Sequence, residues 1–149
     1  MSDSAPEKHG FTLVELLMTM AILGLAATAV VIAAPDPRPS LGEEADRFAA
    51  RLIKAREESL LTNRPVAMEA TAEGYGVSRF EGQDWVPLSE GPFQPGVWDE
   101  ATLIDTSDEG VRIVFDPTGV AEPATVTLTR ERTRVTIAVD AAGEVRVDG

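Results

Sequence analysis

Residues 10–34 read GFTLVELLMTMAILGLAATAVVIAA and decide how the rest of the chain is organised. From Phe11 to Ala34 there are 24 residues with a single charge, Glu15, although the 149-residue chain holds 13 Lys and Arg and 25 Asp and Glu. A helix of this length is about 36 Å long, whereas a bilayer core is about 30 Å thick. We therefore expect a transmembrane helix over 11–34, followed by a soluble domain of about 110 residues.

Three classes of segment could contain this apolar run. A secretory signal peptide has about 7–15 apolar residues before a small-x-small cleavage site. Here the run after Glu15 has 19 residues, and Ile32 occupies the −3 position of the best site, which follows Ala34. A plain signal anchor explains the length but neither Glu15 nor the Gly10-Phe11 junction. A cleaved leader that ends at Gly10 explains both.

The junction Gly10-Phe11-Thr12-Leu13-Val14-Glu15 resembles the class III leader junction of type IV prepilins and type II secretion pseudopilins. The resemblance implies that residues 1–10 are a leader cleaved after Gly10 by a prepilin peptidase, which also N-methylates Phe11. It further implies that Glu15 pairs with the amino group of a neighbouring subunit during assembly. Glu15 could instead complement the positive end of its own helix dipole, worth about 0.3–1 kcal/mol. The two effects have the same sign, so both stay open.

The composition excludes several classes of function. The chain has no cysteine and a single histidine, His9, which removes thiol chemistry, Ser–His triads and His–zinc sites. The net charge of −12 opposes binding to nucleic acid, which requires clustered Lys and Arg. We therefore expect no enzyme, no cofactor and no metal site.

Residues 35–40 form a proline-rich linker. Pro35, Pro37 and Pro39 each disfavour helix at the preceding residue, so we expect an extended spacer. Pseudopilins generally run one long helix from the membrane into the soluble domain, whereas this linker predicts a break.

A second, amphipathic helix is expected over residues 41–62. Ser40 and Glu43 form a capping box, and Asn63-Arg64-Pro65 ends the helix. Apolar residues recur at helical spacing and should face the core: Leu41, Ala45, Phe48, Ala49, Leu52, Ile53, Leu60 and Leu61. The charged residues, Glu44 among them, are expected to form a solvated face.

After Pro65 the apolar period changes to two, which indicates β-strands. The candidate strands are 66–71, 74–80, 84–88, 101–105, 111–115, 124–130, 133–140 and 144–148, with a Gly/Pro-rich loop over 89–100. One helix followed by short strands predicts an α+β domain over 41–149, with the amphipathic helix packed on an antiparallel sheet.

Two stretches near the C-terminus indicate which subfamily of pseudopilins the chain resembles. Phe115-Asp116-Pro117-Thr118-Gly119 and Ala142-Gly143-Glu144-Val145-Arg146-Val147 resemble the C-terminal region of the H-type minor pseudopilin of the general secretion pathway. This implies a pilin-like fold and a subunit near the tip of the type II secretion pseudopilus, which helps to export folded proteins across the outer membrane.

The same resemblance implies a location and partners. The chain would cross the inner membrane of a Gram-negative bacterium once, with its C-terminal domain in the periplasm. Its partners would be the prepilin peptidase and N-methyltransferase, other major and minor pseudopilins, and an exported protein. The alternative is a minor type IV pilin with a binding role in DNA uptake or adhesion.

Three further groups of residues have an ordinary structural explanation. Arg130, Arg132 and Arg134 surround an expected hairpin turn and should be solvated, with contact to an anion or DNA as the alternative. Acidic residues gather around a loop, where calcium is an alternative: Asp105, Asp108, Glu109 and Asp116. Trp85 and Trp98 could face partners, and one of them is expected in the core.

Overall fold

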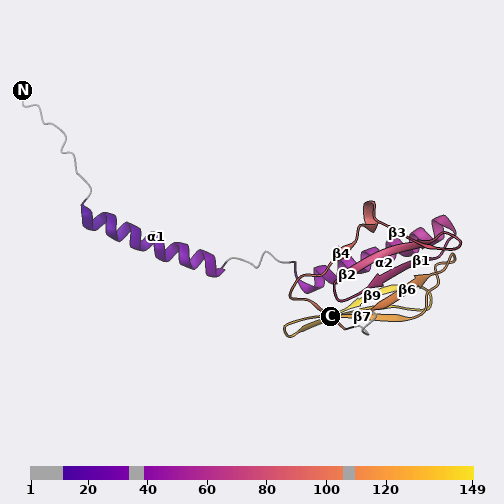
Figure 1. Ribbon diagram of the computed structural model, residues 1–149. Helices are drawn as coiled ribbons and strands as arrows, with labels where there is room; N and C mark the ends of the chain where they lie inside the picture. The colour runs from indigo at the N-terminus through magenta and orange to yellow at the C-terminus, as the bar shows by residue number, and fades with distance from the viewer. Residues whose placement is uncertain (1–11, 34–38, 106–109) are drawn as a thin grey trace, which may run out of the picture. The chain divides into compact units, whose positions relative to one another are not determined.

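The computed structural model describes residues 12–33, 39–105 and 110–149, which form two separate units (Figure 1). The first unit contains helix α1, Leu13–Ala33. Thr12 caps it, because the Glu15 N–H donates to Thr12 Oγ1 at 3.3 Å and the Leu16 N–H donates to the Thr12 carbonyl at 3.1 Å. Among the described residues, no helix has both the length and the hydropathy of a membrane span.

Several predicted features lie outside the described residues. They are the leader 1–10, the Gly10-Phe11 junction, the first and last residues of the 11–34 segment, and prolines 35 and 37 of the linker. The predicted break in the helix therefore also lies outside them, although α1 ends at Ala33 and the next helix begins at Leu41.

Helix α2, Leu41–Thr62, opens the globular unit at the predicted bounds. The capping box is confirmed, since the Glu43 N–H donates to Ser40 Oγ at 3.2 Å and the Ser40 N–H donates to Glu43 Oε2 at 2.7 Å. Asn63 ends the helix in the left-handed conformation, with φ of 53°, and its N–H donates to the Ser59 carbonyl.

The strands form two antiparallel sheets rather than one. The first has the order β3-β2-β1-β6, with β4 also paired to β2, and the second has the order β5-β7-β8-β9. The bounds are β1 Val66–Ala70, β2 Gly74–Phe80, β3 Trp85–Leu88, β4 Gly96–Val97, β5 Leu103–Asp105, β6 Val111–Phe115, β7 Ala124–Arg130, β8 Thr133–Val139 and β9 Val145–Asp148. All the predicted strands are confirmed, to within two residues at either end.

The segment 89–100, predicted to be a loop, contains a short 3₁₀ helix, Gly91–Phe93, and strand β4. Gly96 of β4 pairs with Tyr75 of β2, and a Cβ atom at Gly96 would lie 2.2 Å from the Tyr75 ring. A two-residue strand of this kind forms because it pairs with a strand distant in the sequence, and no local sequence pattern indicates such a pairing.

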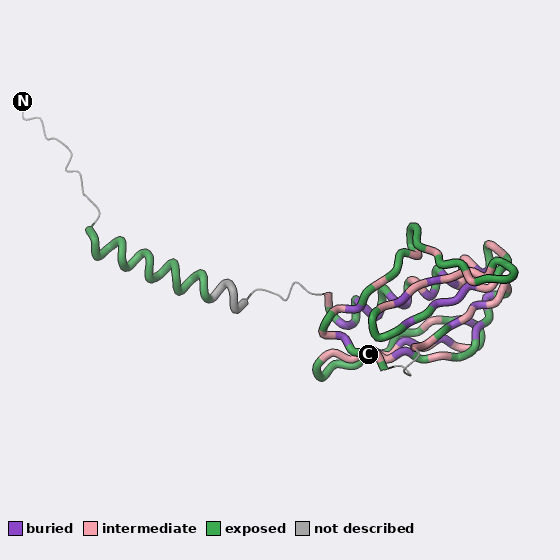
Figure 2. Tube along the Cα trace, in the orientation of Figure 1, coloured by how far each residue is buried: buried purple, intermediate pink, exposed green. Residues whose placement is uncertain are grey.

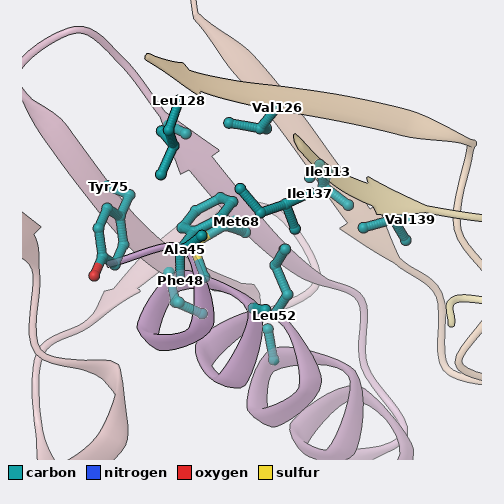
Figure 3. Packing of buried hydrophobic residues seen from close by; sticks show 14 of the residues in the cluster. Ala45, Phe48, Leu52, Met68, Tyr75, Ile113, Val126, Leu128, Ile137 and Val139 are labelled. Carbon is teal, nitrogen blue, oxygen red and sulfur yellow. The ribbon is translucent and has the colours of Figure 1, made fainter. Parts of the chain in front are cut away.

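The core lies between α2 and the two sheets (Figure 2). Helix α2 contacts β1 and β6 of the first sheet and β7, β8 and β9 of the second. The largest fully buried side chains come from all three layers and include Phe48, Leu52, Met68, Phe115, Leu128 and Ile137. Figure 3 shows Phe48, Leu52, Met68, Leu128 and Ile137 converging. The predicted α+β fold, with a helix packed on antiparallel strands, is confirmed.

Three apolar residues of α2 were predicted to face this core and do not. Ile53, Leu60 and Leu61 are 45%, 47% and 82% exposed. Ala55 and Ser59 occupy the inward positions in that half of the helix and are fully buried. Because Ala55 and Ser59 are small, the helix lies close to the sheets at these two positions. The bulkier side chains of Ile53, Leu60 and Leu61 point away from the sheets.

Candidate functional site

Glu15 lies in the first turn of α1, and its side chain is exposed. Its backbone N–H bonds to Thr12 Oγ1, but no group among the described residues pairs with its carboxylate. The neighbouring apolar side chains, Leu13, Leu16 and Leu17, are 75%, 55% and 61% exposed. The arrangement is an exposed carboxyl group, without a partner in the part of the chain that the structure describes, at the start of an exposed apolar helix. It can accept a cationic amine from outside the chain.

The two C-terminal signature stretches form turns with the same hydrogen bonds. In residues 116–120, Asp116 Oδ1 accepts from the N–H groups of Thr118 at 2.8 Å and Val120 at 3.1 Å. In residues 140–144, Asp140 Oδ1 accepts from the N–H groups of Ala142 at 3.0 Å and Glu144 at 2.9 Å. The third residue after each aspartate is a glycine with positive φ. Asp116 belongs to the first stretch, whereas Asp140 lies two residues before the second, so the signature marks two turns that aspartates anchor.

Arg56 of α2 joins these two turns. Its Nε–H donates to the Gly119 carbonyl at 3.0 Å, and its Nη2–H donates to the Ala142 carbonyl, also at 3.0 Å. One turn follows β6 of the first sheet and the other follows β8 of the second. A single guanidinium thus connects both sheets to the helix, although Arg56 was expected on the solvated face.

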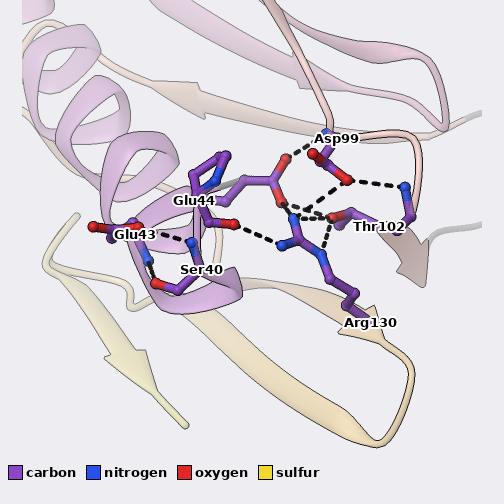
Figure 4. Close-up of polar contacts among 8 residues, drawn as sticks. Ser40, Glu43, Glu44, Asp99, Thr102 and Arg130 are labelled. Atoms are coloured by element: carbon purple, nitrogen blue, oxygen red, sulfur yellow. Dashed lines mark hydrogen bonds and ion pairs between the residues drawn. The ribbon is translucent and has the colours of Figure 1, made fainter. Parts of the chain in front are cut away.

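Glu44 is also not solvated, which corrects a second expectation for α2. It is 6% exposed and lies on the same side of the helix as Leu41 and Phe48. Its Oε1 accepts from the Asp99 N–H at 2.7 Å, and its Oε2 accepts from the Thr102 hydroxyl at 2.7 Å (Figure 4). These two donors give the buried carboxylate hydrogen bonds in place of those that water would make.

Arg130 completes this cluster instead of lying in a solvated turn. Its Nη2–H donates to Glu44 Oε2 at 2.8 Å and to Thr102 Oγ1 at 2.8 Å, and its Nη1–H donates to the Pro39 carbonyl at 2.6 Å (Figure 4). Its side chain is 14% exposed. Arg132 and Arg134, by contrast, are exposed as expected. We call Pro39, Glu44, Asp99, Thr102 and Arg130 the junction cluster.

The two tryptophans differ as expected. Trp98 is buried, and its Nε1–H donates to the Thr71 carbonyl at 2.8 Å. Trp85 is half-buried, with the Arg112 guanidinium 4.4 Å from its ring centre.

The acidic loop residues do not form a visible cation site. No group of three Asp, Glu or His in the part of the chain that the structure describes could hold a metal ion. Asp108 and Glu109 lie outside that part, and Asp116 is engaged in its own turn.

Sequence reasoning missed the junction cluster and the Arg56 contacts. One signal for Glu44 was present, because it lies three residues after Leu41 and four before Phe48, both assigned to the core. For Arg130 and Arg56 no such signal exists. Their partners lie up to 91 and 86 residues away in the chain.

Comparison with known proteins assigns both parts of the chain. The family model described as type II transport protein GspH matches residues 44–143, and the prokaryotic N-terminal methylation motif matches residues 6–31. The chain is 33% identical over 86 residues to type II secretion system protein H of Aeromonas hydrophila, a match that covers 55% of this chain and 47% of that protein. The chain thus spans about half the length of that relative.

Two further similarities concern the pilin-like fold. Pilin-like protein PilA1 of Thermus thermophilus is 30% identical over 133 residues, which cover 81% of this chain and 85% of that protein. The minor pseudopilin EpsH from the type 2 secretion system of Vibrio cholerae superposes with a TM-score of 0.59 at 13% identity, over 70% of this chain and 92% of that structure. The similarity to EpsH is one of fold. Because the GspH model covers most of the globular unit and the methylation motif covers the N-terminal segment, this chain belongs to the GspH family, and its globular unit has a pilin-like fold.

Proposed function

We propose that this chain is a non-catalytic subunit of the type II secretion pseudopilus, that it assembles near the tip, and that it helps to drive folded proteins across the outer membrane. Its family consists of structural subunits. The single observation that carries the proposal is the exposed carboxylate of Glu15, which pairs with no group in residues 12–33, 39–105 or 110–149, in the first turn of an exposed apolar helix. That carboxylate follows the Gly10-Phe11 junction by four residues.

Maturation supplies the partner for this carboxylate. A prepilin peptidase cuts between Gly10 and Phe11 and methylates the new amine of Phe11. The amine of an incoming subunit then binds Glu15 of a neighbour, which removes an unpaired charge from an apolar environment. Residues 11–34 cross the inner membrane once, residues 35–40 link the two units, and residues 41–149 lie in the periplasm.

The experiment has two steps. First, mass spectrometry of the chain from cells that contain a prepilin peptidase should find a mature form that begins with N-methylated Phe11. An intact Met1, or cleavage after Ala34, would contradict the proposal.

Second, Glu15→Gln and Glu15→Asp should be compared for cross-linking to other pseudopilins and for export of a folded protein into the medium. Glu15→Gln should lose both, whereas Glu15→Asp keeps the charge and should retain part of each. Equal loss in the two variants would show that charge pairing is not the cause. Thr19→Val serves as a control, because Thr19 is an exposed residue of α1 whose hydroxyl bonds only to the Leu16 carbonyl.

A minor type IV pilin with a role in DNA uptake or adhesion is the second candidate. The observation that favours it is the match to PilA1, which covers more of this chain than the match to secretion protein H. Complementation separates the two functions. A pseudopilin restores protein export to a strain without its own H subunit, whereas a pilin restores surface pili or DNA uptake to a strain without its minor pilins.

A further inference from the structure

The junction cluster lies where the chain enters the globular unit. Pro39 directly precedes Ser40, the N-cap of α2, so the Pro39 carbonyl stands outside the helix and takes no part in its hydrogen bonds. The Nη1–H of Arg130 donates to this carbonyl at 2.6 Å. The contact therefore attaches the chain just before the helix to a residue 91 positions later.

Arg130 itself is held firmly. It is the last residue of β7, a strand hydrogen-bonded to both β5 and β8. Its guanidinium contacts Glu44 Oε2 and Thr102 Oγ1 as well as Pro39, and its Nη2 lies 3.8 Å from Asp99 Oδ1. Three segments that are distant in the sequence thus meet on one side chain, most of which is shielded from water.

We propose that Arg130 is the residue that transmits mechanical load from the N-terminal segment to the sheets of the globular unit. A force applied to the chain before Pro39 has two routes into the domain. One runs through the first turn of α2, which the Ser40–Glu43 capping box secures. The other runs through the Pro39 carbonyl and Arg130 into the middle of the second sheet.

The second route matters because the end of a helix frays easily, whereas β7 is paired on both sides up to Thr129, the residue directly before Arg130. Without Arg130, the load falls on the first turn of α2 alone. That turn would then open before the core does. The inference rests on the proposed function only for the source of the force, which is a helix anchored in a moving fibre. The contacts themselves do not depend on it.

The test is a pulling experiment in two directions on the full chain in detergent micelles. The chain has no cysteine, so engineered cysteines provide unique attachment points. Handles at Thr28→Cys and Gly149→Cys send the force through Pro39. Handles at Glu73→Cys and Gly149→Cys load the later strands, and Pro39 lies outside the stretched segment.

Arg130→Gln is the main variant, and Arg130→Lys, which retains the charge but not the guanidinium fork, is used if Arg130→Gln does not fold. With the first pair of handles, the rate of the first opening step at constant force should rise about tenfold, which corresponds to about 1.4 kcal/mol. With the second pair it should rise clearly less, because that direction reports only the general loss of stability on removing the Glu44–Arg130 pair. Arg132→Gln, two residues away, exposed and without a partner among the described residues, should change neither rate.

Two results would overturn the proposal. An equal rise in both directions would show that Arg130 stabilises the fold in general and has no directional role. No rise with the first pair of handles would show that the capping box alone carries the load. Neither result depends on export, so failure of this inference is distinct from failure of the proposed function.

Discussion

The carbonyl oxygen of Gly119 lies 2.1 Å from the position that a Cβ atom on Gly143 would occupy. Each glycine belongs to one of the two aspartate-anchored turns, and each has a positive φ, 80° and 73°. The turns therefore pack backbone against backbone, with the Arg56 guanidinium between them and α2. This close approach explains physically why position 143 requires glycine, whereas at position 119 the positive φ disfavours any other residue.

Gly143→Ala should accordingly be among the most damaging single substitutions in the globular unit. The added methyl group meets the Gly119 carbonyl and the Arg56 side chain, and the backbone conformation disfavours any side chain. We expect a loss of about 3 kcal/mol or more in the free energy of unfolding. Gly91→Ala is the matched control, because Gly91 has a φ of 57° but open space around it. It should cost only about 1–2 kcal/mol. Equal costs in urea unfolding would contradict the close packing of the turns.

Arg56→Gln should weaken the connection between the two sheets. The variant loses two charge-assisted hydrogen bonds to backbone carbonyls, so we expect unfolding to become easier by about 2 kcal/mol. Hydrogen exchange should accelerate in both turns, 116–120 and 140–144. Lys54→Gln, on the same helix but paired only with exposed Glu57, should cost at most about 1 kcal/mol. Faster exchange in one turn alone would mean that Arg56 does not couple the two.

Much of this architecture could be predicted from the sequence, because the signals are local. The capping box of Ser40 and Glu43 and the stop at Asn63 set the bounds of α2, and alternation of apolar residues marked the strands. The interior polar contacts could not be predicted in this way. Glu44 and Arg130 are 86 residues apart. The spacing of Glu44 from Leu41 and Phe48 indicates the core-facing side of α2, but nothing in the local sequence identifies Arg130 as its partner. The division into two sheets likewise depends on long-range pairing.

Glu44 and Arg130 should show strong energetic coupling. Glu44→Met leaves the buried Arg130 guanidinium with only the longer contact to Asp99, 3.8 Å, and Arg130→Met leaves the Glu44 carboxylate without its cation. Each single change should cost about 3–5 kcal/mol, because an unpaired buried charge is poorly solvated. The double variant removes both charges and should cost clearly less than the sum of the two. A double-mutant cycle in urea measures the difference. Additive single costs would mean that the two side chains do not interact in solution.

Acid should destabilise the globular unit partly through two exposed carboxylates. The Ser40 N–H and hydroxyl lower the pKa of Glu43, and the hydrogen bond from the Thr118 hydroxyl, aided by backbone N–H groups, lowers the pKa of Asp116. A folded-state pKa below the unfolded value, about 4.3 for Glu and 3.9 for Asp, means that each group stabilises the fold above that pH. This stability is lost as the pH falls through the folded-state pKa.

The melting temperature of the wild-type chain should therefore fall as the pH drops below about 4, and the Glu43→Gln/Asp116→Asn double variant should show a shallower fall. Both replacements keep an oxygen acceptor for the same hydrogen bonds but cannot ionise. Glu122→Gln, at an exposed position whose side chain forms no hydrogen bond or ion pair with the described residues, should leave the slope of the wild-type curve unchanged. Melting followed by circular dichroism between pH 2 and pH 7 measures all three curves. A double variant whose curve parallels the wild type would show that other groups, and not these caps, cause the acid sensitivity.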